Sequence, residues 1–197
     1  MVSERMSINK ILFTLAVLCI SCQVFSQVSK EDTADYIQLY FDNALEYNLM
    51  IAASKGLDTE VKRMILQGAD IKAETEEGAT PLIIAVANVK PRAVDTLLAY
   101  GADPNKITSN YETSLLIILK KMVSFEAVEN NILTASKESD CLQIAESLLR
   151  YGADIDFQDR FGATVINYAS IYGSFSFVDQ LLYYMADIDK KSGDGTT

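Results

Sequence analysis

Aspartate is the residue type in this sequence that could most readily support chemistry, because it recurs at regular intervals. Six aspartates lie within or just after a Gly-Ala-Asp or Met-Ala-Asp tripeptide: Asp70, Asp103, Asp154, Asp156, Asp187 and Asp189. Paired carboxylates can act as a general acid and base, and carboxylates that converge from one short loop can bind calcium. The densest set lies in the stretch GADIDFQDR, which also contains Asp159.

Turn formation explains these aspartates better than catalysis does. An aspartate side chain readily accepts a hydrogen bond from the backbone two residues further on, which stabilises a tight turn. The Gly-Ala-Asp tripeptide starts at Gly68, Gly101 and Gly152, and Met185 starts a near copy. We therefore predict that the carboxylates shape turns, and that the chain has no metal site and no catalytic residues.

Other catalytic sets are missing from the sequence. The chain has no histidine, so neither a Ser-His-Asp nor a Cys-His site can be built from it. Cys141 follows Asp140, whose negative charge disfavours a reactive thiolate. The sequence has no glycine-rich phosphate-binding loop. These features predict a protein that is not an enzyme and binds no cofactor, and an enzyme of an unrecognised kind is the weakest hypothesis.

Composition limits the architecture and the class of partner. The chain has 197 residues, of which 49% are hydrophobic, so it can form one domain or one short repeat array. Its formal net charge is −10. A chain this acidic is a poor candidate for nucleic-acid binding, which needs clustered lysine and arginine.

The N-terminal leader has the three parts of a secretory signal peptide. Arg5 and Lys10 give a positive start, an apolar run spans residues 11–20, and a more polar stretch leads to a cleavage site after Ser26. The run is too short to span a bilayer, which needs about 20 apolar residues. We therefore expect a periplasmic or secreted bacterial protein. Because the serine before Cys22 fits a lipoprotein motif, an outer-membrane lipoprotein anchored at Cys22 is the alternative.

The glycines define a repeat period. Gly68 and Gly101 are 33 residues apart, and Gly152 and Met185 are again 33 residues apart. Gly101 and Gly152 are 51 residues apart, which corresponds to one period plus an insertion of 18 residues. A fixed period of this length is typical of a solenoid of stacked units.

Each unit is predicted to contain two short helices. Thr80 and Pro81 suit the start of the first helix, because threonine caps unpaired N–H groups and proline has none to leave unpaired. Thr113 and Thr164 occupy equivalent positions. The second helix carries an apolar stripe and ends at a glycine. The predicted core consists of Leu49, Leu82, Leu115 and Ile166, of Ala52, Ala85 and Ala169, and of the stripes Val61-Met64-Ile65, Val94-Leu97-Leu98, Ala145-Leu148-Leu149 and Val178-Leu181-Leu182.

These units resemble ankyrin repeats, in which Gly-x-Thr-Pro-Leu-His-x-Ala-Ala, a glycine, a Val/Leu-rich helix and Gly-Ala-Asp-x-Asn follow one another. The segments GATPLIIAVA (78–87) and LLAYGADPN (97–105) match best, and GATVINYAS (162–170) follows the pattern in the fourth unit. The resemblance covers residues 42–197. It implies an all-α solenoid of helix-turn-helix repeats with β-turn tips, whose concave face binds other proteins.

Departures from the family pattern lead to further predictions. Tyr111 stands at the first glycine position of the third unit, and Ile118 stands at its small alanine position. A branched side chain at a close helix contact costs about 1–3 kcal/mol unless the helices move apart, so we expect this unit to be distorted. Its insertion should lengthen both helices and form a loop near residues 134–140. The hydrogen bonds of the family histidine must be replaced or lost at Ile83, Leu116 and Asn167.

The register divides the chain into seven segments. We predict a signal peptide, an N-terminal capping helix, four ankyrin repeats (repeats 1 to 4) and the truncated start of a fifth, at residues 1–26, 27–41, 42–74, 75–107, 108–158, 159–191 and 192–197. Repeat 3 contains the insertion. The capping helix would cover the end of the solenoid, and a partner-binding helix is the alternative for this segment.

Partner recognition is expected at the turn tips and on the first helices. By register, the binding candidates are Glu76, Glu77, Asn110, Tyr111, Glu112, Arg160, Phe161 and Tyr172, with further groove positions at Ala87, Asn88, Lys120, Lys121 and Ile171. Arg160, Phe161 and Tyr172 are the most suggestive group, because aromatic residues and arginine often anchor interfaces. Alternatively, Phe161 packs on the neighbouring turn and Tyr172 on the next helix.

The expected function is therefore non-catalytic binding of a partner protein, as a general interaction scaffold. The acidic charge also supports a narrower hypothesis, in which the chain is an inhibitor or immunity-type protein that shields a basic enzyme or toxin.

Overall fold

The computed structural model describes residues 44–126 and 132–190. These residues fall almost entirely within one compact unit, Asn48–Thr197. The predicted signal peptide (1–26) with Cys22, the capping helix (27–41) and the start of a fifth repeat (192–197) lie outside the described residues.

The described helices come in pairs, one pair for each predicted repeat. In repeat 1, residues 44–55 are helical and α3 spans Asp58–Leu66. The later pairs are α4 (Pro81–Ala87) with α5 (Pro91–Ala99), α6 (Ser114–Glu126) with α7 (Ile132–Arg150), and α8 (Val165–Tyr172) with α9 (Phe175–Tyr183).

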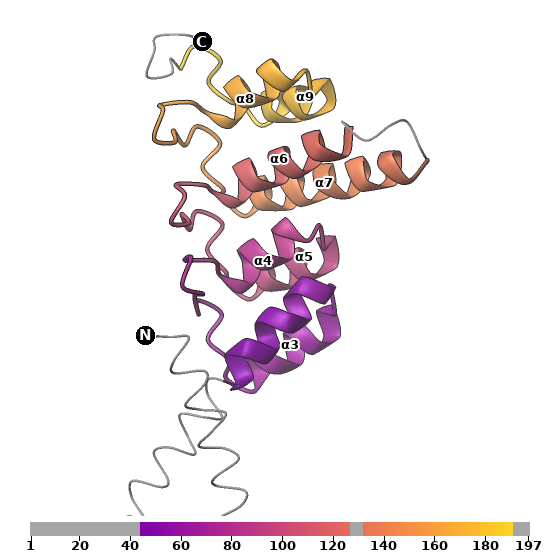
Figure 1. Ribbon diagram of the computed structural model, residues 1–197, viewed down its shortest axis with the longest axis vertical. Helices are drawn as coiled ribbons and strands as arrows, with labels where there is room; N and C mark the ends of the chain where they lie inside the picture. Colours follow the sequence, from indigo (N-terminus) through magenta and orange to yellow (C-terminus); the bar gives the residue numbers. More distant parts are fainter. Residues whose placement is uncertain (1–43, 127–131, 191–197) are drawn as a thin grey trace, which may run out of the picture. The chain divides into compact units, whose positions relative to one another are not determined.

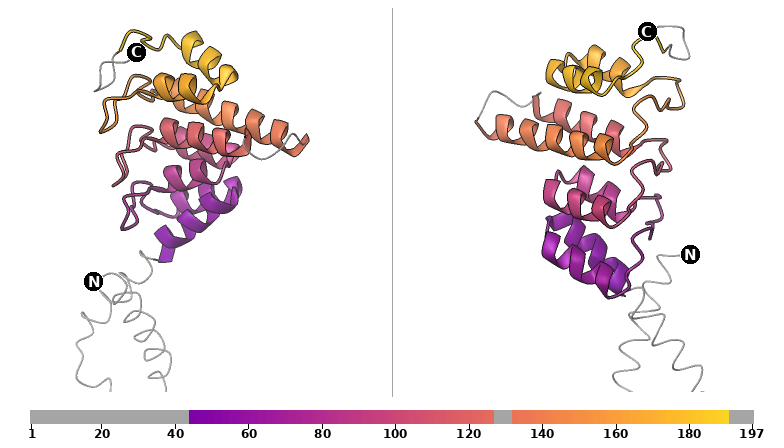
Figure 2. Two further views of the ribbon diagram at one scale, coloured as in Figure 1. Left: turned by 45° about the horizontal axis from the view of Figure 1, so that its top comes forward. Right: turned by 180° about the vertical axis from the view of Figure 1, so that it is seen from behind.

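The pairs stack in sequence order. The first helices α4, α6 and α8 pack in one row, and the second helices α3, α5, α7 and α9 pack in another. In Figures 1 and 2, the pairs lie one above the next and the turn tips project along one side. This arrangement confirms the predicted all-α solenoid of helix-turn-helix repeats.

The first helices begin as the sequence predicts. The hydroxyl Oγ1 of Thr80 accepts from the backbone N–H of Ile83 at 3.4 Å, and Pro81 is the first residue of α4. The same 3.4 Å bond joins Thr113 to Leu116 N–H and Thr164 to Asn167 N–H.

Glycine ends the second helices in the left-handed conformation. Gly68, Gly101 and Gly152 have φ of 99°, 90° and 86°. The alanine after each glycine donates its N–H back to the last turn, as in Ala102 to the Leu97 carbonyl at 3.0 Å. Met185 takes the same conformation with a φ of 66°, so the fold imposes this corner even on a residue with a side chain.

The periodic aspartates act in turns, as predicted. Four of the six accept a hydrogen bond from the backbone N–H two residues later, at 2.8 to 3.0 Å, and these four are Asp70, Asp103, Asp154 and Asp187. Polar side chains also link the turns of neighbouring repeats. Asn105 accepts from Asp154 N–H at 2.7 Å, and Asp156 accepts from Asp187 N–H at 2.9 Å.

The predicted core is largely confirmed. Leu49, Leu82, Leu115 and Ile166 are buried, and so are the small residues Ala52, Ala85 and Ala169. The prediction for Leu182 is wrong, because 43% of its surface is exposed whereas its counterpart Leu98 is 3% exposed. Leu98 lies on α5, which packs against α7 of the next pair, whereas no further pair lies beyond α9 within the described residues.

Repeat 3 absorbs its insertion by extending both helices. α6 has 13 residues and α7 has 19, compared with 7 and 9 in the helices of repeat 2. The loop predicted at residues 134–140 is wrong, because these residues lie inside α7. The sequence from 132 to 150 contains neither glycine nor proline, so nothing in it breaks the helix. Ile118 is fully buried.

Candidate protein-binding surface

The tips of repeats 2, 3 and 4 have the same hydrogen-bonded turn. In repeat 2, the Thr75 N–H donates to the Ala79 carbonyl, the Thr75 carbonyl accepts from the Gly78 N–H, and the Thr75 side chain accepts from the Ala79 N–H. Thr108 and Asp159 make the equivalent three bonds in repeats 3 and 4. The tips of repeats 2 and 3 are also bonded to each other, since the Ser109 N–H and hydroxyl both donate to the Glu77 carbonyl.

The tips expose most of the predicted binding residues. Those that are exposed are Glu76, Glu77, Asn110, Tyr111, Arg160 and Phe161, and Glu112 is half-buried. Phe161 is 65% exposed and therefore does not bury its ring on the neighbouring turn. The guanidinium carbon of Arg160 lies 5.4 Å from the centre of the Phe161 ring, so these two side chains form one feature at the tip of repeat 4.

A cluster of charged and aromatic side chains connects the tips to the first helices. Lys120 on α6 binds the Glu112 carboxylate at 2.5 Å, and its ammonium lies 5.9 Å from the centre of the Tyr168 ring on α8. The Tyr168 hydroxyl donates to Asp159 at 2.6 Å. Tyr172 stacks on Tyr168 with ring centres 6.2 Å apart.

This cluster connects the predicted binding residues Arg160, Phe161 and Tyr172. The residues that connect them were not among the predicted binding residues. Tyr168 and Asp159 join Tyr172 to the tip that carries Arg160 and Phe161. Tyr172 is 44% exposed and remains accessible beside this network.

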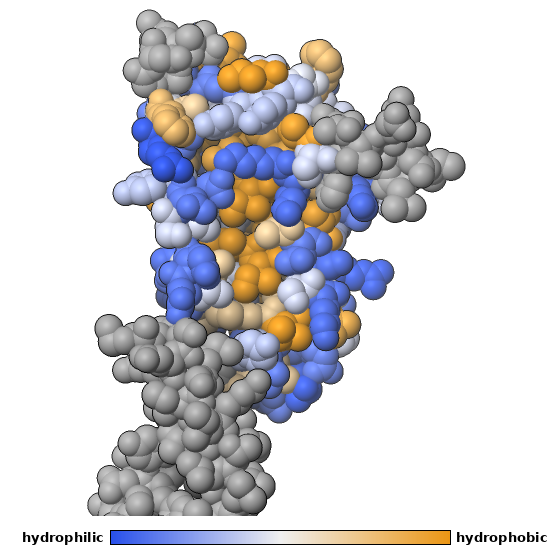
Figure 3. All heavy atoms as spheres, viewed as in Figure 1, coloured by the Kyte–Doolittle hydropathy of each residue, from blue (hydrophilic) through white to orange (hydrophobic). Residues whose placement is uncertain are grey.

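A row of apolar residues that was not predicted from the sequence lies along the first helices. Ile51, Ile84, Ile117 and Tyr168 occupy one register position in repeats 1 to 4, and all four are half-buried. The repeat period could have revealed this row, because the residue after each missing family histidine is large and apolar. In Figure 3, hydrophobic surface runs lengthwise along the stack between hydrophilic margins.

Burial and hydrogen bonding shift the pKa values of two groups on this surface. Burial and the bond to Asp159 raise the pKa of Tyr168 to about 12, so its hydroxyl stays neutral and donates at ordinary pH. A hydrogen bond from the Thr75 side chain lowers the pKa of Glu77, so this exposed tip residue stays ionised.

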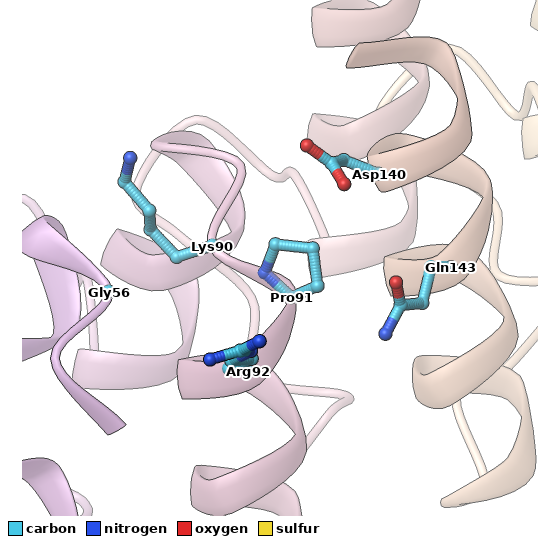
Figure 4. A pocket seen from close by; sticks show the side chains of 6 residues that line it. All are labelled: Gly56, Lys90, Pro91, Arg92, Asp140 and Gln143. Carbon is cyan, nitrogen blue, oxygen red and sulfur yellow. The ribbon is translucent and has the colours of Figure 1, made fainter. Parts of the chain in front are cut away.

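Two shallow grooves are open to solvent. One, of about 270 Å³, runs along α6 and is lined by Glu112, Ile117, Lys120, Lys121 and Ser124. The other, of about 490 Å³, lies on the side away from the tips, where Gly56, Lys90, Pro91 and Arg92 face Asp140 and Gln143 of α7 (Figure 4). Neither groove has an aromatic residue in its lining. The groove on α6 is the better candidate for protein recognition, because its lining includes Ile117, a large apolar residue of the row on the first helices.

The missing family histidine is replaced in two ways. Ile83 and Leu116 are buried and contribute apolar packing. Asn167 instead accepts from the Thr164 N–H at 2.9 Å and completes a capping box at the start of α8.

None of the helices among the described residues has the length and hydrophobicity needed to cross a membrane.

Comparison with known proteins agrees with this geometry. Residues 49–129 match the sequence model for ankyrin repeats, in three copies. The chain therefore contains ankyrin repeats, and its fold is an ankyrin-repeat solenoid. Ankyrin repeats are in general protein–protein interaction modules.

Several curated proteins share this repeat region. A putative ankyrin repeat protein of Acanthamoeba polyphaga mimivirus is 32% identical over 65% of this chain and 22% of its own length. An ankyrin repeat and KH domain-containing protein of Caenorhabditis briggsae is 33% identical over 70% of this chain and 6% of its own. Phosphocholine transferase AnkX of Legionella pneumophila is 29% identical over 60% of this chain and 15% of its own. The chain thus spans less than a quarter of each of these relatives.

Proposed function

We propose that this protein binds a partner protein through the tips and first helices of its repeats, and that it catalyses no reaction itself. The observation that carries this proposal is the row of half-buried apolar residues that follows the stack through Ile51, Ile84, Ile117 and Tyr168. Tyr172 is exposed and stacks on Tyr168 of this row, and Phe161 is exposed at the tip of the same repeat. Apolar surface with aromatic anchors and a charged rim is the usual composition of a protein interface.

Paired aromatic substitutions test this surface. With the partner captured from the organism's extract, Phe161→Ala and Tyr172→Ala should each weaken binding by a factor of about ten or more, because exposed aromatic anchors dominate interfaces. Phe175→Ala and Tyr183→Ala are matched controls, since both residues are 81% exposed but lie on the second helix α9. Isothermal titration calorimetry would measure the affinities. Loss of binding in the controls alone would contradict the proposal.

The narrower hypothesis of an inhibitor for a basic enzyme or toxin is supported by charge. The chain carries a net charge of −10, and the tip of repeat 2 exposes Glu76 and Glu77. Attraction between opposite charges speeds association and weakens as salt increases. A series of ionic strengths separates the two hypotheses: a steep loss of affinity with salt favours the charged inhibitor, and a flat dependence favours a general scaffold.

We further propose that the protein is exported, on the basis of its leader sequence. The expected mature chain begins at Gln27, and the alternative begins at a lipidated Cys22. Mass spectrometry of the N-terminal peptide from the native host would distinguish these two products. An intact Met1 on the mature protein would contradict both.

A further inference from the structure

Four large apolar side chains on and next to helix α9 are exposed to solvent. Phe175 and Tyr183 are each 81% exposed, Met185 is 84% exposed and Leu182 is 43% exposed. Figure 1 shows α9 at the end of the stack, and no helix pair packs beyond it within the described residues. We call these four residues the α9 patch. A cluster of exposed apolar residues often marks an interaction site.

The α9 patch follows one side of the helix and its C-terminal end. Because successive residues of an α-helix are about 100° apart around its axis, Phe175, Leu182 and Tyr183 point into one sector roughly 100° wide. Met185 follows the last turn of α9, and its N–H donates to the Leu182 carbonyl at 3.0 Å. Asp179 points into the same sector and is the only charged residue in the sequence of α9. The patch is therefore apolar apart from one carboxylate.

Met185 stands at a position that is glycine in repeats 1 to 3. The equivalent residues are Gly68, Gly101 and Gly152, and the φ of Met185 is 66°. This left-handed conformation costs a residue with a side chain more than it costs glycine. The Met185 side chain gains little from packing within its own chain, because most of it is exposed. A strained and exposed methionine indicates a contact outside the fold of a single chain.

The exposed area of the α9 patch is close to the apolar area that a dimer interface needs. A fully buried Phe or Tyr removes about 150–250 Å² from water, so two rings that are 81% exposed offer roughly 300 Å². Leu182 and Met185 raise this area to roughly 400 Å². A standard interface covers about 800 Å² on each partner, of which roughly 60% is apolar. The patch can therefore supply most of the apolar part of one such interface.

We propose that the α9 patch joins two copies of this chain in a symmetric dimer. In a two-fold contact the same patch is used by both copies, so it must be complementary to itself. Methionine beside aromatic rings meets this requirement, because its flexible thioether packs favourably against rings. Aromatic residues and methionine are also enriched in interfaces. The inference goes beyond the proposed function, because α9 belongs to the row of second helices and not to the tips and first helices.

The composition of α9 favours apolar contact over recognition of a charged partner. One of its nine residues is charged, compared with four of the nine residues of α3. Two copies that each carry a net charge of −10 repel one another, and salt screens this repulsion. Dimerisation through the patch should therefore strengthen as salt increases. A basic partner at the same patch would instead lose affinity with salt.

Analytical ultracentrifugation of the full chain over a range of protein and salt concentrations tests this inference. We expect a monomer–dimer equilibrium that becomes tighter as salt increases. Phe175→Ala and Tyr183→Ala should each weaken the dimer by about tenfold or more, because aromatic anchors dominate interfaces. Since both side chains are mostly exposed, their truncation should leave the thermal unfolding midpoint unchanged.

Leu66→Ala is the matched control for Tyr183→Ala. Leu66 occupies the position of Tyr183 in repeat 1 and is 68% exposed on α3, so its truncation should change the dimer dissociation constant by no more than about twofold. Met185→Asp adds a charge to each copy and should abolish the dimer. Because aspartate tolerates the left-handed conformation better than most residues, this variant should still fold. All variants keep the same N-terminal region, so only the differences between them report on the α9 patch.

Three results would overturn the proposal. The first is a chain that stays monomeric at every concentration. The second is a dimer that Phe175→Ala, Tyr183→Ala and Leu66→Ala affect equally, and the third is a dimer that weakens as salt increases. The test is independent of the proposed function, because Phe175→Ala and Tyr183→Ala should lose the dimer and still bind the captured partner.

Discussion

Repeats 2 and 3 are neighbours that have the same backbone structure but different residues at three equivalent positions. At the tip, at the first helical position and at the close helix contact, repeat 2 has Gly78, Pro81 and Ala85, and repeat 3 has Tyr111, Ser114 and Ile118. Both repeats nevertheless form the same tip and the same threonine cap. The stack therefore sets the backbone, and the side chains of repeat 3 adapt to it at some cost in stability.

The three residues of repeat 3 affect stability in different ways. Tyr111 is strained in its backbone, whereas Ser114 is fully buried with a hydroxyl oxygen that has no hydrogen-bond partner. Ile118 instead fills space, since it is fully buried where repeat 2 has an alanine. The first two features should lower stability, and the third should contribute to it.

The largest expected effect is that of Ile118→Ala, which gives repeat 3 the small residue of repeat 2. Because the surrounding helices already accommodate the larger side chain, truncation should leave a cavity and destabilise the protein by about 2–5 kcal/mol. Chemical denaturation followed by circular dichroism would measure the change. Ile117→Ala is the control, since this neighbouring isoleucine is half-buried and should cost less. Equal losses in the two variants would contradict the packing described for Ile118.

A smaller effect of opposite sign is expected for Ser114→Pro. Proline suits the first position of α6 and removes the unpaired buried hydroxyl, so the protein should become more stable by about 1 kcal/mol. Ser114→Ala separates the two contributions, because it removes the hydroxyl without constraining the backbone. A lower unfolding midpoint for Ser114→Pro would show that the start of α6 does not share the geometry of Thr80 and Pro81 at the start of α4.

The sequence predicts those parts of the fold that depend on local chemistry. Threonine caps, glycine corners and aspartate turns each involve bonds within a few residues, so their positions follow from residue type and period. The core positions follow from the same period. Leu182 is the informative exception. Its exposure depends on whether another helix pair covers α9, and the residue type and the period do not indicate this.

The insertion and the candidate site follow less directly from the sequence. Residues 134–140 are polar enough to suggest a loop, but they contain no helix breaker and continue α7. Tyr168 bonds to Asp159 and stacks on Tyr172 within repeat 4, and it contacts Lys120 of repeat 3. The contact with Lys120 crosses repeats, so the spacing within a single repeat does not encode it.

Hydrogen–deuterium exchange on the complex with the captured partner tests the central claim most directly. Binding through the tips and first helices predicts added protection at the tips of repeats 3 and 4 and along α6 and α8, with the second helices α5 and α9 unchanged. Protection confined to α5, α7 and α9 would place the partner on the opposite side and contradict the account.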